Sequence, residues 1–78
     1  MPPRLTTPVR LVLAHLRASG PDHGSAIAAA TGLGAGTVYP ILHRLAAAGW
    51  LTTTAETGPH PSRPARRLYS LTTAAPTS

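Results

Sequence analysis

Four side chains that can donate hydrogen bonds, together with a proline, lie close together in the chain: Thr37, Tyr39, Pro40, His43 and Arg44. A guanidinium can fork onto a guanine edge or a phosphate, a hydroxyl can donate to a phosphate, and an imidazole can do either. Spaced along one side of a helix, these groups predict contact with nucleic acid. The alternative for Tyr39 and Pro40 is a structural role, with the ring partly buried and the proline suited to a helix start.

The helix that positions these groups is predicted over residues 37–48, ending at Gly49. Its apolar face has the spacing i, i+3, i+4, i+7 and consists of Val38, Ile41, Leu42 and Leu45. Pro40 leaves two alternatives for the start. If Thr37 is the N-cap, Pro40 falls in the first turn, where no hydrogen bond is lost. If Gly34 is the N-cap, Pro40 bends the helix near its beginning.

Two shorter helices are predicted before this one. The first has Thr7 as its N-cap, Pro8 at its first position, and an apolar stripe of Val9, Val12, Leu13 and Leu16. The second runs from about Gly24 to Thr31, with Asp22 or His23 near its N-cap and Gly32 just beyond its end.

After Gly49 the apolar period changes to two, which predicts a pair of strands over residues 51–56 and 67–72. The basic segment 58–67 between them is predicted to form a hairpin loop. We assign Trp50 and Tyr69 to the edge of the core. The predicted order is an N-terminal arm over 1–6, one domain over 7–73 and a flexible tail over 74–78.

The charge balance favours an anionic partner. The chain has 78 residues, seven Lys and Arg against two Asp and Glu, and a formal net charge of +5. Arg63, Arg66 and Arg67 lie in the hairpin loop, where we expect them to contact phosphate; a merely solvated loop is the alternative.

Several function classes are excluded by what the sequence holds. There is no Cys, and the four His lie on different predicted elements, so no metal site is expected. No paired carboxylates, phosphate-binding glycine loop or Ser-His-Asp pattern is present, so we expect no enzyme, no catalytic residue and no cofactor. No apolar run is long enough for a membrane span, and a cytoplasmic protein is expected.

Three helices followed by a basic hairpin are the element order of a winged helix, a helix-turn-helix variant. In that fold the helix over 37–48 enters the major groove, and the loop over 58–67 flanks it.

The segments "HGSAIAAATGLGAGTVYPILHRLAAAGWLTT" and "SRPARRLYSLT" resemble the PadR family of winged-helix transcriptional regulators, over about Arg10 to Thr72. The resemblance implies a DNA-binding repressor. It places Tyr39, Pro40, His43 and Arg44 at the DNA face, and it implies that Arg63, Arg66 and Arg67 reach a minor groove or the backbone.

The sequence departs from the family pattern at Ser25, where an aromatic residue is usual, and at "SRPARR", where a Gly-Arg-Pro turn is usual. The chain also ends soon after the second strand. This predicts a minimal form without the family's C-terminal dimerisation helices, and a small-molecule effector is not expected. A homodimer would then use the first helix and N-terminal arm, through Leu5, Val9 and Leu11. The alternative function is an interaction module that binds a protein or RNA through its basic surface.

Overall fold

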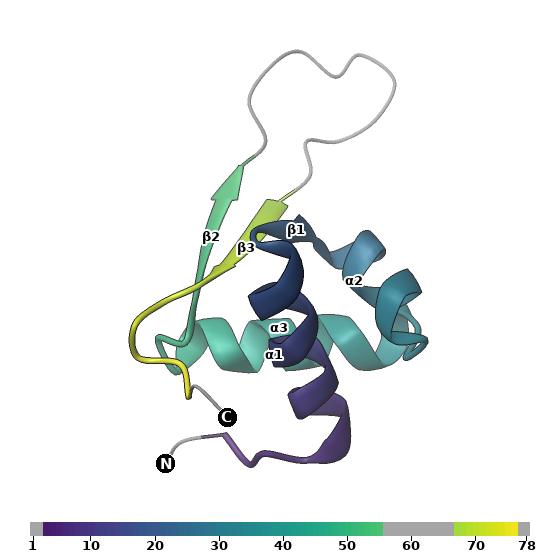
Figure 1. Ribbon diagram of the computed structural model, residues 1–78, viewed down its shortest axis with the longest axis horizontal. Helices are drawn as coiled ribbons and strands as arrows, with labels where there is room; N and C mark the ends of the chain where they lie inside the picture. The colour runs from purple at the N-terminus through teal and green to yellow at the C-terminus, as the bar shows by residue number, and fades with distance from the viewer. Residues whose placement is uncertain (1–2, 56–66, 77–78) are drawn as a thin grey trace.

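The computed structural model describes residues 3–55 and 67–76. The elements follow in the order α1 (Thr7–Ser19), β1 (Asp22–His23), α2 (Gly24–Thr31), α3 (Ala35–Ala47), β2 (Leu51–Ala55) and β3 (Arg67–Leu71). In Figure 1, α1 crosses α3, α2 lies beside the start of α3, and the strands rise from its end. The predicted winged-helix class is confirmed.

The core lies where the three helices meet the beginning of β2. Its ten buried apolar residues come from the predicted stripes of α1 and α3, from α2 and from β2: Val9, Val12, Leu13, Leu16, Ile27, Val38, Ile41, Leu42, Leu45 and Leu51. Trp50 and Tyr69 are partly buried and pack against this core, as expected. The large core side chain of α2 is Ile27; Gly24 is buried as well, and Ala28 is partly buried against the core.

The first helix begins at Thr7, one residue earlier than predicted. Thr6, not Thr7, is the N-cap, and its hydroxyl accepts a hydrogen bond of 3.4 Å from the backbone N–H of Val9. The bounds of α2 match the prediction, with His23 as N-cap and Gly32 in the left-handed conformation (φ 72°) as C-cap.

The third helix begins two residues earlier than predicted, at Ala35, because Gly34 is its N-cap. The Gly34 carbonyl accepts hydrogen bonds from the backbone N–H groups of Thr37 (3.3 Å) and Val38 (3.0 Å). Of the two alternatives for Pro40, the one with Gly34 as cap therefore holds, and Pro40 lies inside the helix.

The sheet has three strands in the order β1-β3-β2, all antiparallel, where the sequence predicts two. The additional strand is the pair Asp22–His23, which pairs with Tyr69 and Leu68 of β3. Two residues are too few to show a period, so only the pairing with β3 reveals this strand. The other two strands, β2 and β3, are those that the sequence predicts, and their register pairs Leu51 with Leu71, Thr53 with Tyr69 and Ala55 with Arg67. Burial does not alternate along β2, because residues 52–55 are all exposed.

The chain after β3 turns back toward α1. The Thr72 hydroxyl donates to the carbonyl of Gly49 (2.6 Å), and Arg17 donates from Nη2 to the carbonyl of Pro76 (3.3 Å). These contacts hold residues 72–76 against the helix-to-strand junction and α1.

Candidate nucleic-acid interface

The residues of α3 fall into three stripes, because a helix advances by about 100° per residue. The core stripe holds Val38, Ile41, Leu42 and Leu45, all buried. An outer stripe, which consists of Thr37, Pro40, Arg44 and Ala47, is exposed along its whole length. A groove stripe, which consists of Tyr39, His43 and Ala46, lies between the core stripe and the outer stripe and turns toward the sheet. The five predicted site residues of α3 are therefore divided between two surfaces.

The outer stripe is the part of α3 that is exposed and can contact another molecule. The side chains of Thr37, Pro40 and Arg44 are exposed, and Arg44 stands in the last turn of the helix. A hydroxyl and a guanidinium two turns apart on a convex surface have the right chemistry to donate to base edges or phosphates in a major groove.

The groove stripe forms one wall of an open groove of ≈ 580 Å³ between α3 and the sheet. The strand register explains the other wall. Leu51 and Leu71 pair at the core end of one sheet face, and the next residues on that face are the paired Thr53 and Tyr69, followed by Arg67. The same sheet face thus runs from the apolar core into a row of polar groups. The described residues that line the groove are Tyr39, His43, Ala46, Thr53, Arg67 and Tyr69.

The chemistry of this groove suits an anion. Two phenols, an imidazole, a hydroxyl and a guanidinium can all donate hydrogen bonds, and no described residue that lines the groove carries a carboxylate. Arg67 donates from Nη1 to the Thr53 hydroxyl at 3.3 Å, so its guanidinium is held across the two strands. A phosphate would supply further acceptor oxygens for these donors.

Sequence reasoning missed part of this site. Thr53 and Ala46 were not predicted as site residues, and Tyr69 was assigned to the core, whereas it both packs on the core and lines the groove. The predicted contacts Arg63 and Arg66, and the loop 58–66, lie outside the described residues, so Arg67 is the only predicted hairpin arginine that the structure locates.

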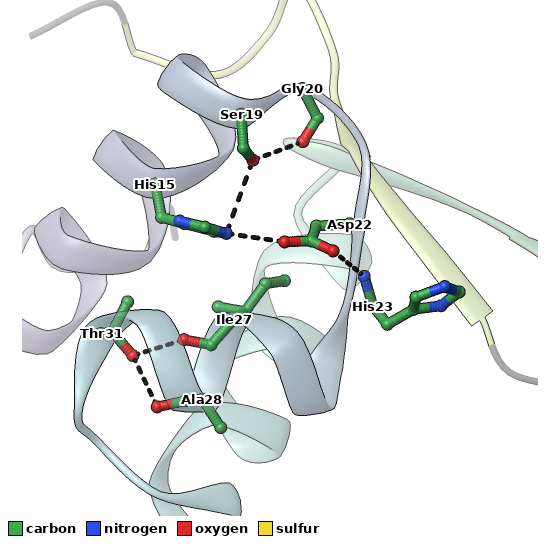
Figure 2. Close-up of polar contacts among 8 residues, drawn as sticks. All are labelled: His15, Ser19, Gly20, Asp22, His23, Ile27, Ala28 and Thr31. Carbon is green, nitrogen blue, oxygen red and sulfur yellow. Dashed lines mark hydrogen bonds and ion pairs between the residues drawn. The ribbon is translucent and has the colours of Figure 1, made fainter.

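A second polar cluster, which includes Asp22, joins α1 to β1 (Figure 2). His15 donates from Nε2 to Asp22 Oδ2 at 2.8 Å, and Asp22 Oδ1 accepts from the backbone N–H of His23 at 2.9 Å. The hydrogen bond from His15 holds the pKa of the Asp22 carboxyl below its usual 3.8; partial burial opposes this shift, and the His23 N–H and the histidine charges reinforce it.

This cluster contains Ser, His and Asp but has the wrong geometry for a catalytic triad. Ser19 Oγ lies 3.5 Å from His15 Nε2, the same nitrogen that contacts Asp22, and the Ser19 hydroxyl donates to the carbonyl of Gly20 at 2.9 Å (Figure 2). A triad needs the serine on one ring nitrogen and the carboxylate on the other. The cluster is therefore a structural link between α1 and the sheet.

Two further findings describe the structured part of the chain. Within residues 3–55 and 67–76, no group of three or more His, Cys, Asp or Glu side chains is placed to hold a metal ion. Over the same ranges, none of the helices combines the length and the apolar character needed to cross a bilayer.

Comparison with protein families gives a match. The model of the family described as "Transcriptional regulator PadR-like family" matches residues 12–75, which include most of α1, all of α2 and α3, and the sheet. No curated protein matches the chain. The family match spans far more than half of the sequence and agrees with the winged-helix order of elements: the chain belongs to the PadR-like family of transcriptional regulators.

Proposed function

We propose that this transcriptional regulator binds a specific DNA sequence and represses transcription by occupying a promoter. The observation that carries the proposal is the division of α3 into two donor-bearing surfaces. The outer stripe, with Thr37 and Arg44, enters the major groove and reads bases. The groove beside it receives the sugar-phosphate backbone.

The phosphate contact follows from the groove lining. Tyr39 and His43 approach from α3, while Arg67, Thr53 and Tyr69 approach from the sheet. A backbone that runs between a helix in the major groove and the adjacent hairpin passes through this space. The net charge of +5 attracts DNA over a longer range, but it does not select a sequence.

Two arginines separate base reading from backbone binding. We expect Arg44→Ala to weaken binding to the preferred sequence by about 1–3 kcal/mol and to relax the preference at one base position. We expect Arg67→Ala to weaken binding about equally on all sequences and to make the dependence of log affinity on log salt shallower by about 1. The matched pair removes the same charge from two surfaces, so each variant is the control for the other.

The experiment is to recover and sequence genomic fragments bound by the purified chain at about 150 mM salt, a concentration at which non-specific binding is weak. A sharp motif near promoters is expected, and Arg44→Ala should blur it while Arg67→Ala leaves it sharp. Recovery that depends only on fragment length would contradict the proposal and favour the alternative, a module that binds protein or RNA through its basic surface.

A homodimer is the expected assembly, because two modules on paired half-sites gain specificity that one small footprint lacks. The predicted interface needs correction. Val9 is only 4% exposed and belongs to the core, and Leu5 packs against the core. Leu11 of α1 is 41% exposed and is left as the apolar contact that a partner could cover. Sedimentation of the wild-type chain and of Leu11→Arg, with and without DNA, tests whether α1 contributes.

A further inference from the structure

Gly24, the first residue of α2, lies directly against the ring of Tyr39. It is buried, and a β-carbon at this position would lie 2.5 Å from Cε1, 2.9 Å from Cζ and 3.0 Å from the hydroxyl oxygen of Tyr39. Carbon atoms in van der Waals contact are about 3.5–4.0 Å apart. Any side chain at residue 24 would therefore push the Tyr39 ring out of its place.

The backbone does not explain the glycine. Gly24 is part of α2, and its conformation does not lie in the left-handed region, unlike that of Gly32 at the other end of the same helix (φ 72°). An alanine would fit this backbone and favours a helix by about 1 kcal/mol over glycine in a helix interior. Space for the tyrosine ring is what position 24 requires.

The ring that occupies this space is one wall of the groove. Tyr39 is 45% exposed, so one part of the ring contacts the first turn of α2 while another part faces the groove. His43 follows one turn later on the same stripe. The position of the phenol relative to Thr53, Arg67 and Tyr69 is thus set by how closely α2 approaches α3.

We infer that Gly24 is a positioning residue for DNA binding: the absence of its side chain lets the Tyr39 ring rest against α2 and holds the phenol at the wall of the groove. This inference rests on the proposed function, because it assigns the groove to the DNA backbone. Gly24 itself touches no DNA and acts through Tyr39.

The test is a double-mutant cycle with Gly24→Ala, Tyr39→Ala and the double variant, measured by fluorescence anisotropy on the DNA sequence that the wild-type chain prefers. We expect Gly24→Ala to lower the affinity about tenfold, the effect of losing one hydrogen bond to a charged group. In the Tyr39→Ala background, the same substitution should cost nothing. An equal loss in both backgrounds would overturn the inference, because the effect would then come from α2 itself.

A second readout does not use DNA. The NMR signals of the Tyr39 ring in the free protein should shift in Gly24→Ala, and they should stay in place in the control Ala29→Gly, which changes an exposed residue of the same helix. Unmoved ring signals in Gly24→Ala would overturn the inference. If Gly24→Ala does not fold, the double variant should fold, since removing the ring frees the space; a double variant that also fails to fold contradicts the inference.

The two proposals fail in different ways. A wild-type chain without sequence preference refutes the proposed function, and the inference about DNA affinity falls with it. Wild-type binding that is specific and that Gly24→Ala leaves unchanged refutes the inference alone.

Discussion

Replacing Asp22 by Asn tests how much the link between α1 and β1 contributes to stability. The substitution keeps the size of the side chain and removes its charge, so the hydrogen bond from His15 Nε2, 2.8 Å long in the wild-type chain, loses its ionic character. The side chains of His15 and Asp22 are 20% and 24% exposed, which places the pair between a buried and a surface interaction. A hydrogen bond to a charged group contributes about 1.5–3 kcal/mol when buried, and an exposed ion pair about 0–1 kcal/mol. We therefore expect a loss of about 1 kcal/mol at pH 7, or about 4–8 °C in Tm for a domain of this size.

The pH dependence of this loss has a definite sign. The pKa of Asp22 in the folded chain lies below its usual 3.8. A carboxyl group of this kind stabilises the fold at pH values above its unfolded pKa, and the contribution disappears as the pH falls through the folded pKa. The difference between wild type and Asp22→Asn should thus shrink as the pH falls below 3.8 and through the folded pKa of Asp22.

Urea unfolding followed by the fluorescence of Trp50, the single tryptophan, measures this difference at each pH. Trp50 packs against the core, so its emission reports global unfolding. The control is His15→Gln in both backgrounds, and the coupling energy between the two sites should equal most of the loss. A difference that does not shrink as the pH falls below 3.8, or a coupling energy of zero, would refute the reasoning.

Two further predictions concern the core and the proline of α3. Leu42→Ala removes a side chain that is 0% exposed and should lower the free energy of unfolding by about 3 kcal/mol. Leu11→Ala, at a position 41% exposed, should lower it by less than about 1 kcal/mol. Urea unfolding measures both losses, and equal losses would contradict the assigned core. Pro40→Ala restores an N–H inside α3 and should raise the free energy of unfolding by about 1–2 kcal/mol in the same assay. A loss of stability would show that packing of the proline ring stabilises the fold by more than the missing hydrogen bond would.

The helices and most of the core could be predicted from the sequence because the 3.6-residue period is a local signal. The buried stripes of α1 and α3 are those that the spacing indicates, and Gly32 ends α2 as expected. The N-cap residues were harder to predict. Thr6 and Thr7 are adjacent and chemically identical candidates, and the choice depends on which backbone N–H groups are left to satisfy once the helix has formed.

The groove and β1 were not predictable because they arise from pairing between distant segments. Alternation places Tyr69 and Arg67 on one side of β3, but the pairing of Tyr69 with Thr53 on one edge and with Asp22 on the other exists only in the folded sheet. The link from His15 to Asp22 could not be predicted either, since it depends on the path of the chain between the last turn of α1 and β1. The role of Tyr39 and the other candidate contacts in DNA binding stays a prediction.

The arrangement of α3 also explains why a helix with a proline in its interior is tolerated. Pro40 cannot donate to the carbonyl of Gly36, four residues earlier, and a proline in a helix interior costs about 3 kcal/mol when nothing compensates. Both residues are exposed, so water can reach the carbonyl that the proline leaves without a partner. The lost hydrogen bond falls on the exposed side of α3, and a β-carbon at Gly36 would meet nothing within 4 Å. The core stripe thus keeps its packing while the outer surface of the helix departs from regular α-helical hydrogen bonding. A rigid proline there holds the backbone between Thr37 and Arg44, the two donors proposed to read bases, without a side chain that competes with them for hydrogen bonds.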